Sequence, residues 1–417
     1  MAEYQPLIDN EEQPPPNKNP SRVASLDVFR GLCVSLMMLV DYGGSIFPVI
    51  AHAPWNGLHL ADLVMPFFLF VAGVSLALVY KKVSNRVDSM SKAVLRAVKL
   101  FLLGVLLQGG FFHGINSLTY GVDIERIRWL GILQRIAIGY IIAALCAIWL
   151  SSRTQSKTGF LKIFYYWQWG VALALSAIYL SLLYGLFVPD WQFEISAPTY
   201  TLPANSSYIF KVKCSVRGDL GPSCNAAGMI DRYVIGIGHL YGKPVYRNLQ
   251  ECNMSSSHQV SENSPPWCHA PFDPEGLLSS LTAAVACIIG LQYGHILAHI
   301  QDHKARIENW SVISLSLFVL GLLIAFSGIP VNKSLYTISY MLITSASAGI
   351  TFSALYLLVD VYGYRRLTYV FEWMGVHALS IFIVVTSNLA IIAIQGFYRK
   401  APQDNLIRWI VSFFVHP

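Results

Sequence analysis

The residues of this 417-residue chain that could do chemistry gather near its N-terminus. Asp27, Arg30 and Asp41 lie along one apolar segment. His52 follows just beyond it, and a second apolar segment begins at Asp62. A charge near the middle of a membrane span costs about 2.5–3.5 kcal/mol on insertion scales, so ionisable groups there usually mark a site. Each residue alone is compatible with a helix cap, a snorkelling cation or an ordinary loop histidine. Together they predict a site.

A histidine beside a carboxylate at a membrane boundary is suited to acyl transfer. Neutral imidazole acts as a nucleophile or a general base, and a carboxylate fixes its tautomer. The sequence has no Gly-x-Ser-x-Gly elbow, no Walker loop and no Cys/His metal-binding cluster. We therefore expect His52 and Asp41 to be catalytic. Trp55 and Asn56 would offer a stacking face and amide hydrogen bonds to a polar acceptor.

The composition predicts the elements that must position these residues. Hydrophobic residues make up 54% of the chain and charged residues only 12%, with a mean hydropathy of +0.50. Soluble domains carry about 25% charged residues, so we expect an all-α polytopic bundle of nine to ten transmembrane helices. The apolar spans fall at 23–43, 60–80, 93–112, 130–150, 165–187, 277–299, 309–327, 335–360 and 368–397.

Basic residues predict the orientation of the spans. They concentrate in the loops 81–92 and 151–163 and after the sixth and eighth spans, which all share a side. The positive-inside rule makes that side the cytosol, together with a disordered, Pro-rich tail at 1–22. His52 and the long loop 188–276 then face the lumen or the exterior. No basic run suited to nucleic acid is present.

The long loop carries signs of an oxidising compartment. Four of the seven cysteines lie in it, which predicts two disulfides among Cys214, Cys224, Cys252 and Cys268, with three pairings open. Asn205 and Asn253 are glycosylation acceptors in the same loop. We divide the chain into the tail 1–22, a membrane half 23–187 with the active site, the lumenal loop 188–276, and a second membrane half 277–417.

Further polar residues are candidates for binding. Arg135 is a second intramembrane cation besides Arg30. We expect Asp27 or Asp41 to form an ion pair with these arginines. His295, His299 and His303 share a helix face, but they lack a matching carboxylate or cysteine set, so we assign them to the interface and no metal. The candidate substrate or donor contacts are Arg30, Trp55, Asn56, Asp62, Gln134, Arg135, Asp231, His239 and Glu275.

Five motifs are distributed along most of the chain. They are SLDVFRG at 25–31, HAPWNGLHLADL at 52–63, WLGILQRIAIGY at 129–140, AAGMIDR at 226–232 and IPVNKSLYTISY at 329–340. Together they resemble the heparan-α-glucosaminide N-acetyltransferase family. The resemblance implies transfer of acetyl from cytosolic acetyl-CoA, a co-substrate, to a glucosamine amine on the lumenal side of lysosomal membranes. The family's active histidine matches His52, and its asparagine in the first span matches Asp41. A dileucine-like EYQPLI near the N-terminus fits lysosomal or vacuolar sorting.

The chain departs from the family pattern at both ends. The animal enzyme carries a lumenal β-domain before the first span, whereas a 22-residue tail stands here, and few residues follow NLIRWI. We therefore expect a carbohydrate or another small polar acceptor, and a truncated form at the C-terminus. A transporter of a small polar or anionic solute and a catalytically inactive membrane scaffold are the alternative functions. The oligomeric state stays open, a homodimer included.

Overall fold

The computed structural model describes most of the chain. It covers residues 23–44, 49–81, 83, 85–108, 110–112, 120–122, 127–150, 154–155, 163–196, 207–242, 244–252 and 264–387. The predicted glycosylation acceptors Asn205 and Asn253 lie outside these ranges, as do the predicted tail 1–22 and the end of the chain.

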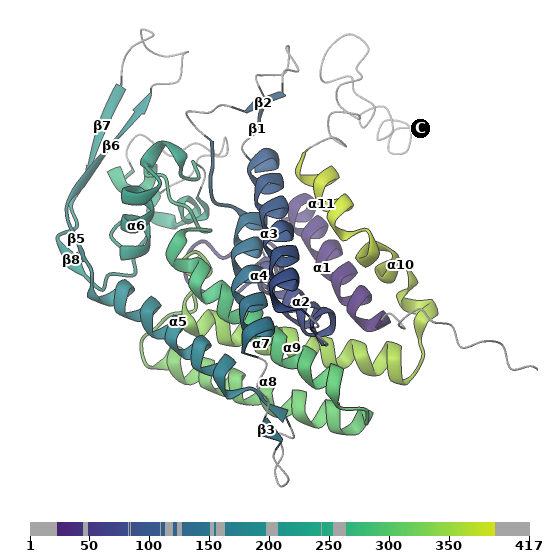
Figure 1. The fold of residues 1–417 in the computed structure, drawn as a ribbon. Coiled ribbons are helices and arrows are strands. Elements are labelled where there is room, and N and C mark those ends of the chain that lie inside the picture. The colour runs from purple at the N-terminus through teal and green to yellow at the C-terminus, as the bar shows by residue number, and fades with distance from the viewer. Residues whose placement is uncertain are drawn as a thin grey trace, which may run out of the picture.

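Long helices dominate the fold (Figure 1). Their bounds are α1 Ala24–Gly43, α2 Leu60–Val79, α3 Arg86–Gln108, α4 Ile132–Trp149, α5 Tyr166–Gly185, α6 Ala226–Val234, α7 Leu277–His299, α8 His303–Phe326, α9 Ile338–Tyr356, α10 Arg365–Val376 and α11 Ala378–Thr386. A π-helical turn, Leu357–Val361, extends α9. The predicted all-α multi-pass architecture is confirmed.

The predicted number of nine to ten spans is not confirmed. Within the described residues, six helices are long and apolar enough to cross a membrane: α2, α4, α5, α7, α8 and α9 with its π turn. A seventh span results if α10 and α11, bent by 65° at their junction, count as one. Helix α1 holds Asp27, Arg30 and Asp41 within 20 residues, and α3 is rich in Arg and Lys, so neither is as apolar as the six.

Helix α7 forms the centre of the bundle, with nearly every side chain buried. Glycines let α2 pack directly on it. A methyl group added at Gly73 would lie 2.0 Å from the Cys287 carbonyl oxygen, and one at Gly290 would lie 2.1 Å from that of Phe70. Small residues allow such backbone contacts between membrane helices. The N-terminal end of α2, which carries Asp62, is thereby fixed against the core.

The segment after α5 folds into a lobe beside the bundle (Figure 1), containing two antiparallel strand pairs that the sequence pattern did not predict. Strand β5 Phe187–Val188 pairs with β8 Val216–Arg217, and β6 Trp191–Ser196 pairs with β7 Ser207–Val212. The two predicted disulfides are confirmed, and the pairing is sequential, Cys214–Cys224 and Cys252–Cys268. Two further short hairpins join β1 Gly110–Phe112 to β2 Tyr120–Val122, and β3 Thr154–Gln155 to β4 Ile163–Phe164.

Helices α10 and α11 close one side of the bundle against α1. A methyl group at Gly31 of α1 would overlap the Phe371 carbonyl, and one at Gly375 of α10 would overlap that of Asp27. This close backbone packing brings α11 beside the residues that line the cavity described below.

Candidate active site

His52 is held by a buried carboxylate at the start of α2. Its Nδ1 lies 2.9 Å from Oδ1 of Asp62, whose side chain is 0% exposed. The second oxygen, Oδ2, accepts the backbone N–H groups of Ala53 at 3.2 Å and His59 at 3.0 Å. One carboxylate thus caps α2, anchors the preceding loop and orients the imidazole. The imidazole itself stays 33% exposed.

Lys333, from the loop between α8 and α9, completes the cluster. Its Nζ lies 2.8 Å from Nδ1 of His52, 3.3 Å from Nε2 and 3.5 Å from Oδ1 of Asp62. Burial lowers the pKa of the Lys333 ammonium, although Asp62 and Glu275 act in the opposite direction. The sequence pattern did not identify Lys333 as a site residue. The available signal was a lysine inside the otherwise uncharged IPVNKSLYTISY segment.

A bridge between two loops brings Lys333 to His52. The backbone of Asn56 pairs with that of Asn332, and the Gly57 N–H donates to the Val331 carbonyl at 2.8 Å. The Asn332 amide donates to Oδ1 of Asn56 at 3.1 Å. Gly57 has φ +117°, a conformation that favours glycine. The amide oxygen of Asn56 thus has a structural partner, and the acceptor contact of Asn56 stays a prediction.

Trp55 also has a structural position. Its indole N–H donates to the Leu220 carbonyl at 2.9 Å, and its ring packs edge-on against Tyr246 and Phe272. The residue is 6% exposed. The predicted open stacking face for an acceptor is not present, because the lobe covers this ring.

Asp41, the predicted catalytic partner of His52, lies in the same site but is not the carboxylate that contacts His52. It lines the cavity that His52 also lines, but the carboxylate bonded to His52 is Asp62. The reason is geometric: Asp62 is on the helix that the histidine loop enters, whereas Asp41 is in the last turn of α1.

The two intramembrane arginines are compensated in different ways. Arg30 pairs with Asp27 at 2.8 Å, as predicted, and donates to Ser75 on α2. Arg135 does not pair with Asp27 or Asp41. It donates to the Pro274 carbonyl and to the Ser279 hydroxyl, and its guanidinium lies 5.1 Å from the Tyr336 ring centroid. The acceptors of Arg135 are neutral because its side chain meets the N-terminal end of α7.

Gln134, the neighbour of Arg135, is fully buried against α3. Neither atom of its amide has a hydrogen-bond partner among the described residues. It is not among the residues that line the cavity.

A second charged cluster lies nearby. Arg128 bonds both carboxylate oxygens of Asp273, at 2.6 and 2.9 Å, and one oxygen of Glu275 at 2.5 Å. Burial raises the pKa of Asp273, with Arg128 opposing it. The pKa of Glu275 is lowered, because Arg128, Arg135 and Lys333 together outweigh its burial.

Three loop residues were predicted to bind the substrate, and only Glu275 lines the cavity. Asp231 accepts the Leu277 N–H at 2.8 Å and so caps α7. Burial raises the pKa of Asp231 to about 7. His239 Nδ1 contacts the Ile127 carbonyl at 2.8 Å.

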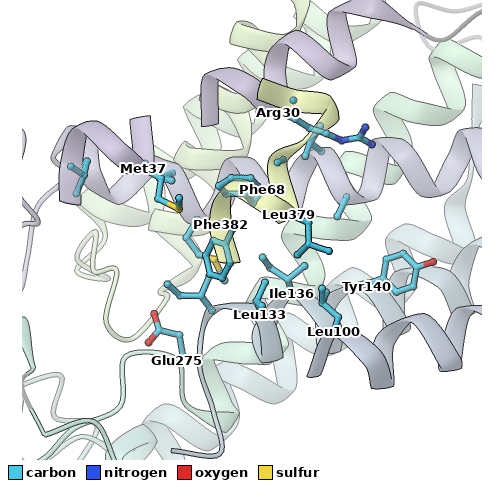
Figure 2. A pocket seen from close by; sticks show the side chains of 18 of the residues that line it. Arg30, Met37, Phe68, Leu100, Leu133, Ile136, Tyr140, Glu275, Leu379 and Phe382 are labelled. Carbon is cyan, nitrogen blue, oxygen red and sulfur yellow. The ribbon is translucent and has the colours of Figure 1, made fainter. Parts of the chain in front are cut away.

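A cavity of about 490 Å³ extends from His52 into the bundle. His52 and Lys333 line it near the start of α2, and Asp41 lines it from the last turn of α1. Arg30 bonds Ser75 further along α2, Arg96 packs on Tyr140, and both arginines line the part of the cavity away from Glu275. The side chains between these two parts are apolar, as Figure 2 shows. Helix α2 lines the cavity from Ala61 to Ser75. At 1.5 Å per residue these positions are about 21 Å apart, most of the roughly 30 Å hydrocarbon thickness of a bilayer.

Comparison with known proteins finds similar sequences around this site. Residues 22–189 match the model for the heparan-α-glucosaminide N-acetyltransferase catalytic domain. The mouse protein named heparan-α-glucosaminide N-acetyltransferase is 30% identical over 404 residues, which cover 92% of this chain and 55% of the relative. The human protein of that name is 29% identical over 388 residues, covering 87% and 52%.

The chain spans about half the length of these curated relatives. The matched region includes His52 and Asp62, whereas Lys333 lies beyond the family model and within the longer alignments. The resemblance noted from the sequence motifs is confirmed. The chain is therefore similar to the proteins named heparan-α-glucosaminide N-acetyltransferase over most of its own length.

Proposed function

We propose that this protein is a membrane acetyltransferase that uses acetyl-CoA from the cytosolic side. The acetyl group passes to an amine, glucosamine-like, or to a hydroxyl of a small carbohydrate at the opposite side. The observation that carries this proposal is the cavity with the His52–Asp62 pair at one end and cationic residues at the other. The names of the related proteins support it.

The cavity suits the chemical layout of acetyl-CoA. The phosphates need cations and water, and Arg30 and Arg96 lie at the far end from His52. A second pocket of about 410 Å³, lined by Tyr80, Lys92 and Arg96 among others, adjoins that end. The apolar middle section can enclose the pantetheine arm. The thioester then reaches His52 without the whole molecule crossing the membrane.

The reaction needs a base for the acceptor. Asp62 accepts the Nδ1–H of His52, which leaves the Nε2 lone pair for the acceptor proton. General-base assistance of this kind contributes about 10²–10⁴-fold. The acceptor nitrogen or oxygen attacks the thioester carbon directly, and CoA leaves as the thiol with the proton that His52 took up. This direct route requires no long-lived acetyl-imidazole.

The same proposal includes an orientation and a compartment. The N-terminus faces the cytosol, and the disulfide-bonded lobe, with Asn205 and Asn253 glycosylated, faces the lumen of a lysosome or vacuole. The placement of the basic residues and the two disulfides support this orientation.

The test uses full-length protein in nanodiscs with radiolabelled acetyl-CoA and glucosamine. We expect acetylated glucosamine from the wild type and none from His52→Ala, with acetyl-CoA binding retained. His269→Gln is the matched control, because this histidine packs in the lobe against Phe210. Transfer near the wild-type rate by His52→Ala would overturn the assignment of the base.

Two other outcomes would replace the proposal. Uptake of solute into proteoliposomes without acetylation would identify a transporter, and neither activity would identify a scaffold. Acetyl trapped on His52 in the absence of acceptor would select the covalent route.

A further inference from the structure

We propose that Lys333 is a catalytic residue whose ammonium group donates a hydrogen bond to the thioester oxygen as negative charge develops on it. This inference rests on the proposed acetyl transfer at His52. It assigns a role to a residue from the second membrane half, outside the stretch 22–189 that matches the family model.

The first argument is a conflict of hydrogen bonds at His52. Nδ1 lies 2.9 Å from Asp62, which only accepts, and 2.8 Å from Lys333, which only donates. A single ring nitrogen cannot satisfy both partners. Asp62 is fully buried and needs a donor, so Nδ1 carries the proton. The lone pair is then on Nε2, 3.3 Å from Nζ of Lys333.

The second argument is position. Nζ lies beside the imidazole ring, 2.8 Å from Nδ1 and 3.3 Å from Nε2, and leaves the outward lone pair of Nε2 open. The acceptor N–H or O–H can therefore hydrogen-bond to Nε2 while the N–H groups of Lys333 remain beside the reacting atoms. The carbonyl oxygen under attack lies next to the attacking atom, within reach of a donor that starts 3.3 Å from Nε2. Lys333 lines the cavity, and its side chain is only 18% exposed.

The third argument is charge and rigidity. Burial lowers the pKa of the Lys333 ammonium, and Asp62, 3.5 Å from Nζ, and Glu275 oppose this effect. The bridge between Asn56 and Asn332 fixes the backbone next to Lys333. A cation fixed in this way stabilises a developing oxyanion without reorganisation, which is the arrangement of an oxyanion hole.

The step balances without any further reactant. The acceptor atom forms a bond to the carbonyl carbon, and the carbonyl π pair moves to the oxygen facing Lys333. His52 Nε2 takes the acceptor proton. When the intermediate collapses, the C–S bond breaks and the CoA sulfur takes that proton from His52. Lys333 keeps its protons throughout.

The kinetic test compares Lys333→Met, Lys333→Gln and Lys333→Arg in nanodiscs. We expect kcat to fall about 10²–10³-fold in the two neutral variants, as when an oxyanion donor is removed. Lys333→Arg should recover part of kcat, and the Kd for acetyl-CoA should stay near that of the wild type in all three. Lys304→Met, at an 85% exposed lysine of α8, is the matched control. Size-exclusion profiles establish that each variant is folded. If Lys333→Met does not fold, the comparison relies on Lys333→Gln.

An infrared measurement separates this role from a structural one. With carbonyl-¹³C acetyl-CoA bound to the inactive His52→Ala variant, the thioester carbonyl band should shift to lower frequency than in solution. In His52→Ala/Lys333→Gln that shift should be lost. If the carbonyl band of the double variant keeps the shifted frequency seen in His52→Ala, the inference is overturned. A kcat near the wild-type value in Lys333→Gln would also overturn it. Acetylated Lys333 in mass spectra after turnover would also overturn it, because the amine would then be a nucleophile.

Failure of this inference differs from failure of the proposed function. If His52→Ala abolishes transfer while Lys333→Gln is active, the histidine assignment stands and only the role of Lys333 falls. If His52→Ala is itself active, the proposed function falls first.

Discussion

Two charged clusters lie near one another in this molecule, and their hydrogen bonding differs. In the Arg128 cluster, three N–H···O bonds of 2.5–2.9 Å join one guanidinium to Asp273 and Glu275, and donors match acceptors. In the His52 cluster, Asp62 and Lys333 compete for the same ring nitrogen. In the Arg128 cluster the three hydrogen bonds do not compete with one another. In the His52 cluster one of the two partners of Nδ1 stays unsatisfied unless a further group binds.

This difference separates a structural ion pair from a reactive site. Exchange of partners by a buried, paired cation is energetically unfavourable, because it leaves one charge buried and unpaired. With the proton of His52 on Nδ1, the lone pair of Nε2 can accept a further donor without breaking an ion pair. Burial and charge alone do not distinguish the two clusters, whereas the count of donors against acceptors does.

Asp62→Asn should have the largest effect on this comparison. The amide presents an N–H where the carboxylate accepted one, so His52 adopts the wrong tautomer and kcat falls on the order of 10³–10⁴-fold. Steady-state acetyl transfer measures it, with Asp88→Asn on the exposed face of α3 as control. A decrease of less than tenfold would show that Asp62 does not orient the base.

Arg128→Met should break the complete cluster instead. Two buried carboxylates lose their cation, and we expect a loss of about 3–5 kcal/mol in the free energy of unfolding. Unfolding by SDS in mixed micelles measures the loss, with Arg366→Met at an exposed site as control. The kcat of the molecules that remain folded should change little. A stable protein without activity would place Arg128 in the reactive site and remove the distinction.

Asp231 gives a pH test beside the Arg128 cluster. Its folded pKa of about 7 lies above the ordinary 3.8, because burial and Asp273 disfavour the anion despite the Leu277 N–H, Arg135 and Arg232. The stabilisation is therefore complete below about pH 4 and is lost as the pH rises through about 7. The slope is at most about 1.4 kcal/mol per pH unit.

Asp231→Asn cannot ionise, so this part of the decline should vanish. Thermal unfolding in detergent between pH 4 and 8 measures the difference between the variant and the wild type. Identical pH dependence of the two proteins would contradict the raised pKa.

Asn56→Ala should have the smallest effect. One hydrogen bond to Asn332 is lost, which costs about 1 kcal/mol, while the backbone bridge remains. Because Lys333 is then held less firmly, kcat should fall modestly with acetyl-CoA binding unchanged. A loss as large as that of Asp62→Asn would show that Asn56 contacts the substrate after all.

The helices were predictable because apolar length is a strong signal. The span predicted at 277–299 is helix α7 with the same bounds, since no charge or proline interrupts it. The strands β5 to β8 were not predictable in this way, because the lobe depends on two disulfides and on packing between distant residues. The bend between α10 and α11 lies inside the single span predicted at 368–397, where no proline marks a break.

The site was predicted in part. His52 stood out because a histidine follows an apolar span that already carries charges, and it lies within the stretch 22–189 that matches the family model. The carboxylate was assigned to Asp41 by sequence proximity to the span, whereas the loop geometry selects Asp62. Lys333 could not be paired with His52, since 281 positions separate them and only the bridge at Asn56 and Asn332 joins their loops.

That bridge has a consequence for biosynthesis. Membrane helices insert as the chain emerges, so the loop with His52 is in place long before residues 331–337 are made. His52 and Asp62 therefore lack Lys333 until the loop before α9 has been synthesised and has paired with Asn56. A nascent chain that meets acetyl-CoA during this interval holds a base but lacks the neighbouring cation. Maturation of the site is thus timed by the second half of the protein.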